Sequence, residues 1–474
     1  MNEVHSSQVS GQRLPLTANV RIILALVGIL IIAALPRLYD LNWDSSHYLH
    51  PDERHIVMVT MDRISLPFPN LEDAHLTDPK RSTLNPRSVD PASGQPRSFA
   101  YGALPLYLLK LVGHAASPLW KAATGIDGLT ILGRLLSVIF DLGTVLLAFL
   151  IGRRLYGARA GLLAALLLSF TVLHIQLSHF YASDTLLTFF LMATLYFGLE
   201  VVERPSKSRV ALMGIAAGLA LSCKVSAAPV LLACAVACFL AGKQATNTTA
   251  AETIDTDSGE KNGAGLRPID GTIFAGVAAV AVFLLFQPYV PMDPQTFLRD
   301  IRYESEMVRG IQIPPYTIQY IGTEPVIYQL RNLFSWTAGP ALTVAILIGL
   351  MALAVRLAWH RRPSEWVIAA WLIPYLIITL SFQVKFVRYL LPVMPLLVIL
   401  AAAWISALVP NSLRLGNWRW RIGVAALLIV IGGTVLQALA YTSIYDSEHT
   451  RVRASRWIYE NVPRGASLAV EHWD

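Results

Sequence analysis

Four consecutive residues, His50, Pro51, Asp52 and Glu53, combine an imidazole with two carboxylates in a polar stretch after the first apolar segment. A carboxylate in this position can remove a proton from a hydroxyl group or accept hydrogen bonds from a polar substrate. It also avoids the cost of about 2.5 to 3.5 kcal/mol that a charge incurs at the centre of a bilayer. The alternative is a solvated pair of loop residues, because a bare dipeptide is weak evidence of a site.

Histidines near this pair raise the question of a metal site. His47, His50 and His55 lie within nine residues of one another. Their spacings match no tight ligand motif. We therefore expect no metal ion and no required cofactor, and a divalent cation is not indicated, with His50 and His55 as weak candidate ligands.

A third carboxylate, Asp184, follows the short segment 177–183 that joins two apolar stretches. It opens the second of two expected helices, so it is a candidate catalytic residue. The alternative is a helix N-cap, and the two roles are compatible. His179, at the end of the preceding helix, is a candidate substrate contact, whereas we expect His174 to be packed.

Two cations lie at the boundaries of apolar stretches, where a charge has no obvious structural need. Lys224 stands between two apolar runs, and Arg388 precedes another. Such residues suit a phosphate or diphosphate, which arginine binds by two hydrogen bonds and lysine as a point charge. The alternative is that both side chains extend to lipid headgroups.

The composition indicates a membrane protein with many spans. Of its 474 residues, 54% are hydrophobic and 15% are charged, and the mean hydropathy is +0.51. The net charge of +7 is carried by short clusters between apolar runs. This pattern is typical of a membrane protein whose loops on one side are rich in Lys and Arg, and not of a nucleic-acid-binding surface. The three cysteines, Cys223, Cys234 and Cys238, have no disulfide or zinc spacing and are expected to pack.

Apolar runs near the length of about 20 residues that crosses a bilayer predict an all-α protein with about eleven membrane helices. The expected spans cover 20–38, 131–152, 160–178, 184–202, 208–223, 225–241, 271–288, 335–356, 364–381, 390–408 and 421–440.

The basic clusters fall on one side of these spans, which is cytoplasmic by the positive-inside rule. This side receives the tail of residues 1–19 and a flexible loop over 242–270. The opposite side receives loops over 39–130 and 289–334 and the tail over 441–474. We expect the active site on that extracytoplasmic face of the plasma (inner) membrane.

The outer segments contain further elements. Residues 101–110 predict a helix lying at the membrane surface, with a true span as the alternative. A helix beginning at Asp293 carries the apolar stripe of Phe297, Ile301 and Val308, and is either a lid or a solvated connector. In the tail, a helix near 452–461 and a strand over 467–471 predict the start of a small outer α/β domain.

Several motifs follow one another along the chain. They are His50-Pro-Asp-Glu53, Gly133-Arg-Leu-Leu-Ser137, Gly152-Arg-Arg-Leu-Tyr-Gly157, Gln176-Leu-Ser-His-Phe-Tyr-Ala-Ser-Asp184, Lys224 and Arg388-Tyr-Leu-Leu-Pro-Val-Met-Pro395. Together they resemble the GT-C glycosyltransferases, and within them family 39, the protein O-mannosyltransferase and aminoarabinose-transferase group that depends on a phospholipid carrier. The resemblance covers about residues 20 to 440.

The resemblance implies a transmembrane catalytic domain that moves a sugar from a polyprenyl or dolichyl phosphate to a protein, lipid or glycan acceptor, with inversion. Asp52 would be the general base or the acceptor-orienting carboxylate, with Glu53 beside it. Asp184 would lie near the sugar, and Lys224, Arg388 and the adjoining Tyr389 near the carrier phosphate.

Two alternatives come from other functional classes. A transporter or flippase for a lipid or sugar would be expected to carry ionisable groups near the bilayer midplane and an internal repeat. A non-catalytic subunit of a membrane assembly would tolerate the loss of Asp52.

Overall fold

The computed structural model describes residues 16–66, 72–252, 267–360, 362–409 and 418–469. Within these ranges the chain is helical, and the pairing of extended backbone is limited to one bridge between Val89 and Pro96. The predicted all-α class is confirmed. The helices that form the bundle are α1 (Leu16–Leu38), α4 (Ile126–Tyr156), α5 (Ala158–Ser169), α6 (Val172–Ser178), α7 (Ser183–Glu203), α8 (Lys207–Cys223), α9 (Val230–Glu252), α10 (Pro268–Phe286), α13 (Gly339–Val355), α14 (Pro363–Leu380), α15 (Met394–Leu408) and α16 (Trp418–Thr442).

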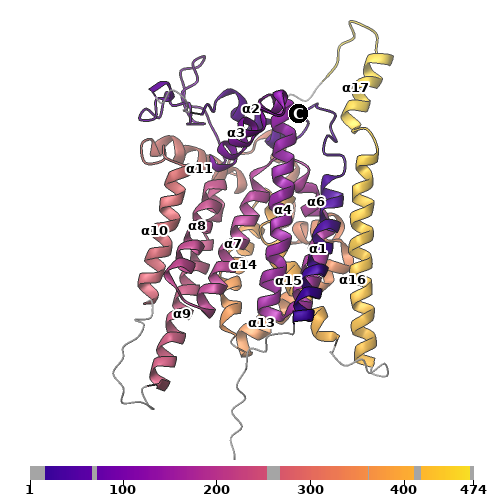
Figure 1. Ribbon diagram of the computed structural model, residues 1–474. Coiled ribbons are helices and arrows are strands. Elements are labelled where there is room, and N and C mark those ends of the chain that lie inside the picture. The colour runs from indigo at the N-terminus through magenta and orange to yellow at the C-terminus, as the bar shows by residue number, and fades with distance from the viewer. Residues whose placement is uncertain (1–15, 67–71, 253–266, 361, 410–417, 470–474) are drawn as a thin grey trace, which may run out of the picture.

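Shorter helices gather at one end of the bundle that the long helices form (Figure 1). We call this the α2 end, because α2 lies there, and α3 and α11 lie at the same end (Figure 1). The shorter elements at this end are α2 (Pro51–Asp62), α3 (Leu104–Ala116), α11 (Pro294–Val308), α12 (Ile327–Asn332) and α17 (Thr450–Asn461), with the short turns η1 (Glu72–Ala74), η2 (Lys121–Thr124), η3 (Val225–Ala227), η4 (Pro315–Tyr320), η5 (Leu333–Thr337), η7 (Val387–Leu390) and η8 (Ser443–Asp446). The turn η6 (Arg356–His360) instead extends α13 at its other end.

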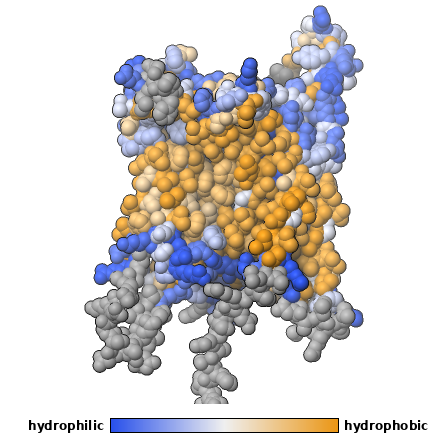
Figure 2. Space-filling model, in the orientation of Figure 1, coloured by the Kyte–Doolittle hydropathy of each residue, from blue (hydrophilic) through white to orange (hydrophobic). Residues whose placement is uncertain are grey.

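Each of the eleven ranges expected to cross a membrane is helical. Among the described residues, eight helices are long and apolar enough to span, and the pair of α5 and α6, bent by 57°, would make a ninth. α8 has 17 residues and α15 has 15, so both are shorter than the eight spanning helices, each of which has at least 18 residues. The multi-pass architecture is confirmed, but the count of eleven is not. On the face shown in Figure 2, an apolar band covers the middle of the molecule between two polar ends.

Small residues allow the helices of the bundle to approach closely. On α8, a Cβ atom at Gly214 would lie 2.4 Å from the carbonyl oxygen of Ala275 in α10, and one at Gly218 would lie 2.5 Å from that of Ala279. Backbone contact of this kind is how helices pack in a lipid environment, where hydrophobic burial between them gives little advantage.

The long loop between α1 and α4 is fastened to α8 and α11. The guanidinium Nε of Arg87 donates to Asp300 in α11 at 2.8 Å, and the backbone N–H of Phe99 donates to the same carboxylate at 3.1 Å. The Gly102 N–H donates to the Cys223 carbonyl at the end of α8 at 2.9 Å. A Cβ atom at Gly102 would lie 1.8 Å from the carbonyl oxygen of Ser222, so this contact requires glycine.

Two outer helices follow the sequence expectations. The helix expected over 101–110 is α3, which begins at Leu104 and packs at the α2 end (Figure 1). α11 begins at Pro294, and the side chain of Asp293 caps it by accepting the Thr296 N–H at 3.2 Å. Its Phe297 is buried.

The linker and the tail differ in part from the expectations. α9 continues to Glu252, inside the stretch expected to be a flexible loop, while 253–266 and the tail of residues 1–15 lie outside the described residues. The helix expected near 452–461 is α17. Residues 467–469 form no strand, so that part of the expected α/β tail is wrong, and residues 470–474 are outside the described ranges. One extended segment has no neighbour to pair with there.

Candidate active site

A cavity of about 1320 Å³ opens among the elements of the α2 end. Its wall is formed by the start of α2, the loop before α3, the start of α7, the junction of α8 and η3, α11, and the segment from the end of α14 to η7. The cavity brings together five of the residues that the sequence singled out, which are Asp52, Asp184, Lys224, Arg388 and Tyr389.

Asp52 lies in the first turn of α2, which Pro51 begins and His50 caps. Its Oδ1 accepts a hydrogen bond from the Tyr101 hydroxyl at 2.7 Å, and its Oδ2 forms an ion pair with Arg388. Asp52 keeps 20% of its side chain exposed, and Arg388 keeps 22%. This pair is therefore reachable from the cavity.

Asp184 and Lys224 form a second pair deeper in the wall. The ammonium of Lys224 lies 3.5 Å from Oδ1 of Asp184, whose side chain is 3% exposed. The other oxygen, Oδ2, is buried with no hydrogen-bond partner among the described residues. Asp184 is the second residue of α7, after the N-cap Ala182, so its side chain does not act as the N-cap.

Aromatic rings surround the cations. The Lys224 ammonium lies 5.8 Å from the ring centre of Tyr101 and 5.6 Å from that of Tyr389, which is the geometry of a cation–π contact. The backbone carbonyl of Tyr389 accepts a hydrogen bond from the Tyr375 hydroxyl at 3.0 Å. Burial raises the pKa of the Tyr101 phenol well above its usual value, so this hydroxyl stays a donor to Asp52.

α11 contributes a carboxylate that the sequence reasoning missed. Glu304 lines the cavity, and burial raises the pKa of this carboxyl while the charge of Lys224 opposes the rise. Phe297, Ile301 and Glu304 follow at intervals of four and three residues, which places all three on one face of the helix. The helical spacing therefore contained the signal, because Glu304 lies on the same face as the apolar residues Phe297 and Ile301.

Glu53 lies outside the cavity wall, although it is adjacent to Asp52 in sequence. Its side chain is 1% exposed and accepts two hydrogen bonds from the Arg134 guanidinium, at 3.0 and 2.6 Å. The backbone N–H of Tyr181 donates to it at 2.8 Å, and Arg134 also pairs with Asp44 at 3.1 Å. This arrangement fastens α2 to α4 and to the turn before α7.

The histidines near the site are mostly fixed by packing. His179 is fully buried, its two ring nitrogens lie 2.7 and 2.9 Å from the carbonyl oxygens of Ile175 and Tyr39, and its ring stacks on Tyr445. These contacts occupy both nitrogens and place His179 away from the cavity lining, so the structure does not support the expected substrate contact. His174 is packed as expected and contacts Asp141.

His50 and His55 do line the cavity, but each is held by other contacts. The His50 ring stacks on Phe180 and accepts the Glu53 N–H, and the His55 ring stacks on Phe99. Within the described ranges, no group of three or more His, Cys, Asp or Glu side chains is arranged to hold a metal ion.

The site thus combines the carboxylates of Asp52, Asp184 and Glu304 with the cations of Lys224 and Arg388 at one end of the bundle. A carboxylate that is partly exposed can remove a proton, and cations beside it can stabilise a departing anion. The buried Nε of Arg388 and Oδ2 of Asp184 have no hydrogen-bond partner among the described residues. Buried polar atoms of this kind are normally satisfied, so both are candidates to contact a ligand.

Comparison with known proteins gives a consistent picture. Residues 126–254, which include Asp184 and Lys224, match the family model described as dolichyl-phosphate-mannose-protein mannosyltransferase. No curated protein sequence matches the chain. Neither the family match nor the structural neighbours support the transporter alternative.

The solved structures that resemble the chain include an oligosaccharyltransferase and ArnT. The oligosaccharyltransferase AglB from Archaeoglobus fulgidus, in complex with an inhibitory peptide and a dolichol-phosphate, has 15% identity and a TM-score of 0.61 over 95% of this chain and 59% of that one. The apo oligosaccharyltransferase of the same organism has 17% identity and a TM-score of 0.56, covering 93% and 58%. ArnT from Cupriavidus metallidurans, bound to undecaprenyl phosphate, has 15% identity and a TM-score of 0.52, covering 90% and 76%.

The chain spans less than two thirds of the length of the oligosaccharyltransferases that it matches. At these identities the likeness concerns the fold. The bundle, the helices at the α2 end and the likeness to these structures together show a multi-pass membrane protein whose fold is shared with the oligosaccharyltransferase AglB and with ArnT.

Proposed function

We propose that the protein is an integral-membrane glycosyltransferase that moves a sugar from a polyprenyl or dolichyl phosphate to an acceptor, with inversion at the anomeric carbon. The observation that carries the proposal is the single cavity shared by Asp52, Asp184, Lys224, Arg388 and Tyr389. Its volume of about 1320 Å³ is larger than a typical small-molecule pocket, so donor and acceptor have room together.

The donor class is supported by two kinds of evidence. Lys224 and Arg388 supply two cations at one wall, which suits the phosphate of a lipid carrier. The solved neighbours were captured with dolichol-phosphate and undecaprenyl phosphate. We extend this class of carrier to the present chain.

The reaction needs one proton transfer and one displacement. Asp52 accepts the proton of the acceptor hydroxyl as its oxygen forms a bond to the anomeric carbon. The bond between that carbon and the phosphate oxygen breaks, and the carrier phosphate leaves with the bonding electrons. Arg388 and Lys224 neutralise the added negative charge, and attack from the opposite face inverts the anomeric carbon.

The other residues position this chemistry. Asp184 holds the ammonium of Lys224, and we assign its free oxygen to the sugar. Glu53 is a positioning residue, because its bonds to Arg134 and Tyr181 fix the turn that carries Asp52. Tyr389 shapes the wall beside both cations.

The face of the membrane follows from the charges of the loops. The basic clusters lie opposite the α2 end, so by the positive-inside rule the cavity faces the extracytoplasmic side. We propose the plasma (inner) membrane as the location.

The direct test is transfer by the purified full-length chain in liposomes, with a panel of labelled polyprenyl-phosphate sugars and solubilised membrane as the source of acceptor. We expect transfer from at least one donor, and expect the Asp52→Asn variant to lose about 10² to 10⁴-fold in rate without loss of folded protein. Wild-type turnover by this variant would refute the base role. Failure with every donor in the panel would refute the transferase function.

Asp78→Asn is a matched control. Asp78 is a carboxylate of the same outer loop, and its Oδ1 accepts the Lys80 N–H at 2.9 Å. Asparagine keeps this acceptor, so the variant should transfer sugar at the wild-type rate.

A further inference from the structure

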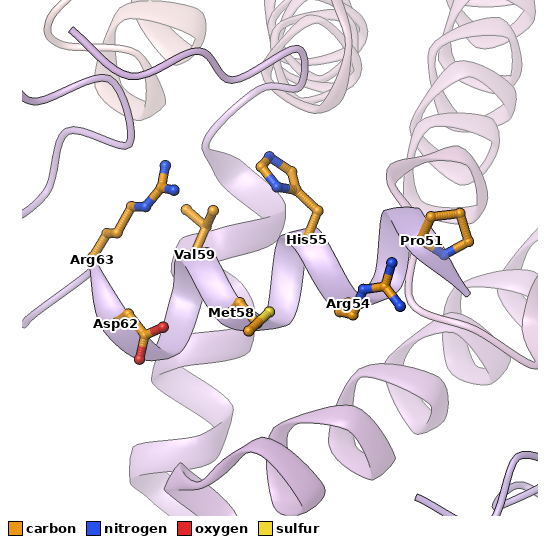
Figure 3. Close-up of a pocket in the computed structure, with 7 residues that line it drawn as sticks. All are labelled: Pro51, Arg54, His55, Met58, Val59, Asp62 and Arg63. Atoms are coloured by element: carbon orange, nitrogen blue, oxygen red, sulfur yellow. The ribbon is translucent and has the colours of Figure 1, made fainter. Parts of the chain in front are cut away.

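A second, smaller recess of about 330 Å³ lies on α2 itself (Figure 3). We call it the α2 recess. Its lining residues are Pro51, Arg54, His55, Met58, Val59, Asp62 and Arg63.

Helical spacing explains why these side chains meet. The lining positions recur every three or four residues, which puts them along adjoining stripes of one helix. In Figure 3 the side chains of His55, Val59 and Arg63 project from the same side of α2. The stacking of His55 on Phe99 fixes one wall of the recess.

The recess carries an excess of positive charge. Arg54 and Arg63 line it with one carboxylate, Asp62. The Nη1 atom of Arg63 is buried and has no hydrogen-bond partner among the described residues. Arg54 uses Nη1 to reach the Tyr48 carbonyl at 3.2 Å.

The surroundings of Arg63 also favour the binding of an anion. Burial lowers the pKa of the Arg63 guanidinium, and the charge of Arg97 adds to this, while Asp90 and Asp62 oppose it. A desolvated guanidinium with a free N–H group is stabilised by a planar or tetrahedral oxyanion.

The α2 recess adjoins the active-site cavity. Pro51 and His55 line both spaces. At a rise of about 1.5 Å per residue, Arg63 stands about 16 Å along the helix from Asp52. A molecule that reaches Asp52 with its hydroxyl can therefore lie along α2 with a charged group at the recess.

We propose that the α2 recess is an acceptor subsite that binds an anionic group, a phosphate or a carboxylate, of the molecule to be glycosylated. The inference rests on the proposed function, because it takes Asp52 as the base that the acceptor must reach. The phosphate of the donor has its own cations, Lys224 and Arg388, inside the cavity. The arginines of the recess are thus available to a second anion.

The test measures the reaction of arginines with phenylglyoxal, followed by mass spectrometry, in the full-length protein held in phosphatidylcholine nanodiscs. Glucose 6-phosphate serves as the probe and glucose as its uncharged counterpart. At ten times its dissociation constant, the probe should slow the modification of Arg54 and Arg63 about tenfold. Glucose should have no effect, and Arg302, which is exposed on α11 and lies outside both linings, should react equally throughout.

A second arm separates an acceptor group from a lipid headgroup. Nanodiscs that contain phosphatidylglycerol are labelled without the probe. Protection by glucose 6-phosphate in neutral lipid supports the subsite. Protection by phosphatidylglycerol alone, or equal labelling with and without the probe, would overturn it.

Variants sharpen the result. Arg63→Gln should weaken protection of Arg54 by glucose 6-phosphate about tenfold, the effect of losing a charged hydrogen bond, whereas Arg302→Gln should not. Because the wild-type labelling needs no variant, a folding defect of Arg63→Gln leaves the test valid. Labelling also needs no sugar transfer, so transfer without protection rejects the subsite alone. Protection without transfer would show an anion-binding recess but would reject the proposed function, and with it the acceptor role of the recess.

Discussion

Asp52 and Glu53 are adjacent in sequence, but they belong to two regions that differ in how completely their buried polar atoms are hydrogen-bonded. Around Glu53, the guanidinium of Arg134 makes five bonds, two each to Glu53 and Asp44 and one to the Leu41 carbonyl. These use every N–H group that an arginine side chain has. Arg134 is fully buried, so this region is a closed and saturated cluster.

In the cavity around Asp52, by contrast, the hydrogen bonding of the buried polar atoms is incomplete. Asp184 and Arg388 each have a buried atom without a hydrogen-bond partner among the described residues, and so does the neighbouring hydroxyl of Ser183. An unsatisfied buried polar atom costs about 1 to 3 kcal/mol. The contrast indicates that the Arg134 cluster contributes to the fold, while the cavity keeps bonding capacity for a substrate.

The largest effect should come from opening the saturated cluster. Arg134→Met would leave the buried carboxylates of Glu53 and Asp44 facing each other without a cation. Removing one partner of a buried ion pair costs about 3 to 5 kcal/mol. We expect a sharp loss of folded protein, measured by size-exclusion chromatography and thermal unfolding in detergent.

Arg388→Met is the matched comparison in the cavity. Its partner Asp52 is 20% exposed and keeps the Tyr101 hydrogen bond. We expect folded protein at the wild-type level with transfer greatly reduced. If Arg388→Met unfolded as readily as Arg134→Met, the contrast between the two regions would be wrong.

The sequence was sufficient for the all-α, multi-pass class and for part of the site, but not for the number of spans. Long apolar runs separated by basic clusters predict helices and their approximate boundaries, because the thickness of the bilayer sets the length of each run. The candidates Asp184, Lys224 and Arg388 were found because each is a charge beside an apolar run, whereas Asp52 was found as one of two adjacent carboxylates in the polar stretch after the first apolar segment. Placement beside an apolar run is unfavourable unless the charge has a partner or a function.

The rest depended on contacts between distant segments. Arg134 lies 81 residues from Glu53, so no local pattern distinguishes the role of Glu53 from that of Asp52. His179 was expected to meet substrate, but its partners are backbone carbonyls, which leave no trace in a sequence. Tyr101 was seen only as part of an interfacial segment, and its hydroxyl reaches Asp52.

A smaller effect should come from breaking the second pair in the cavity. Lys224→Met removes a cation that we place at the carrier phosphate, and loss of one such contact typically costs about 10² to 10³-fold in rate. It also leaves Asp184 unpaired, so some loss of stability is expected. The measurement is the transfer rate per folded molecule.

The double variant Lys224→Met with Asp184→Asn separates the two consequences. It removes the unpaired charge and should recover folded protein, while transfer stays low. Recovery of transfer in the double variant would show that Lys224 serves the fold and not the donor phosphate.

The smallest effect concerns His50, which joins the two regions, since its ring lines the cavity and caps the helix that carries Glu53. Burial, followed by the charges of Arg388 and Arg134, lowers the pKa of His50 from 6.5 to about 3. Between these values the unfolded chain binds the extra proton, so stability falls as the pH falls. Asparagine keeps a cap acceptor but does not titrate. From pH 7 to pH 5, wild-type protein should lose about 1 to 2 kcal/mol more stability than His50→Asn, and equal losses in thermal unfolding would contradict a neutral His50 in the fold.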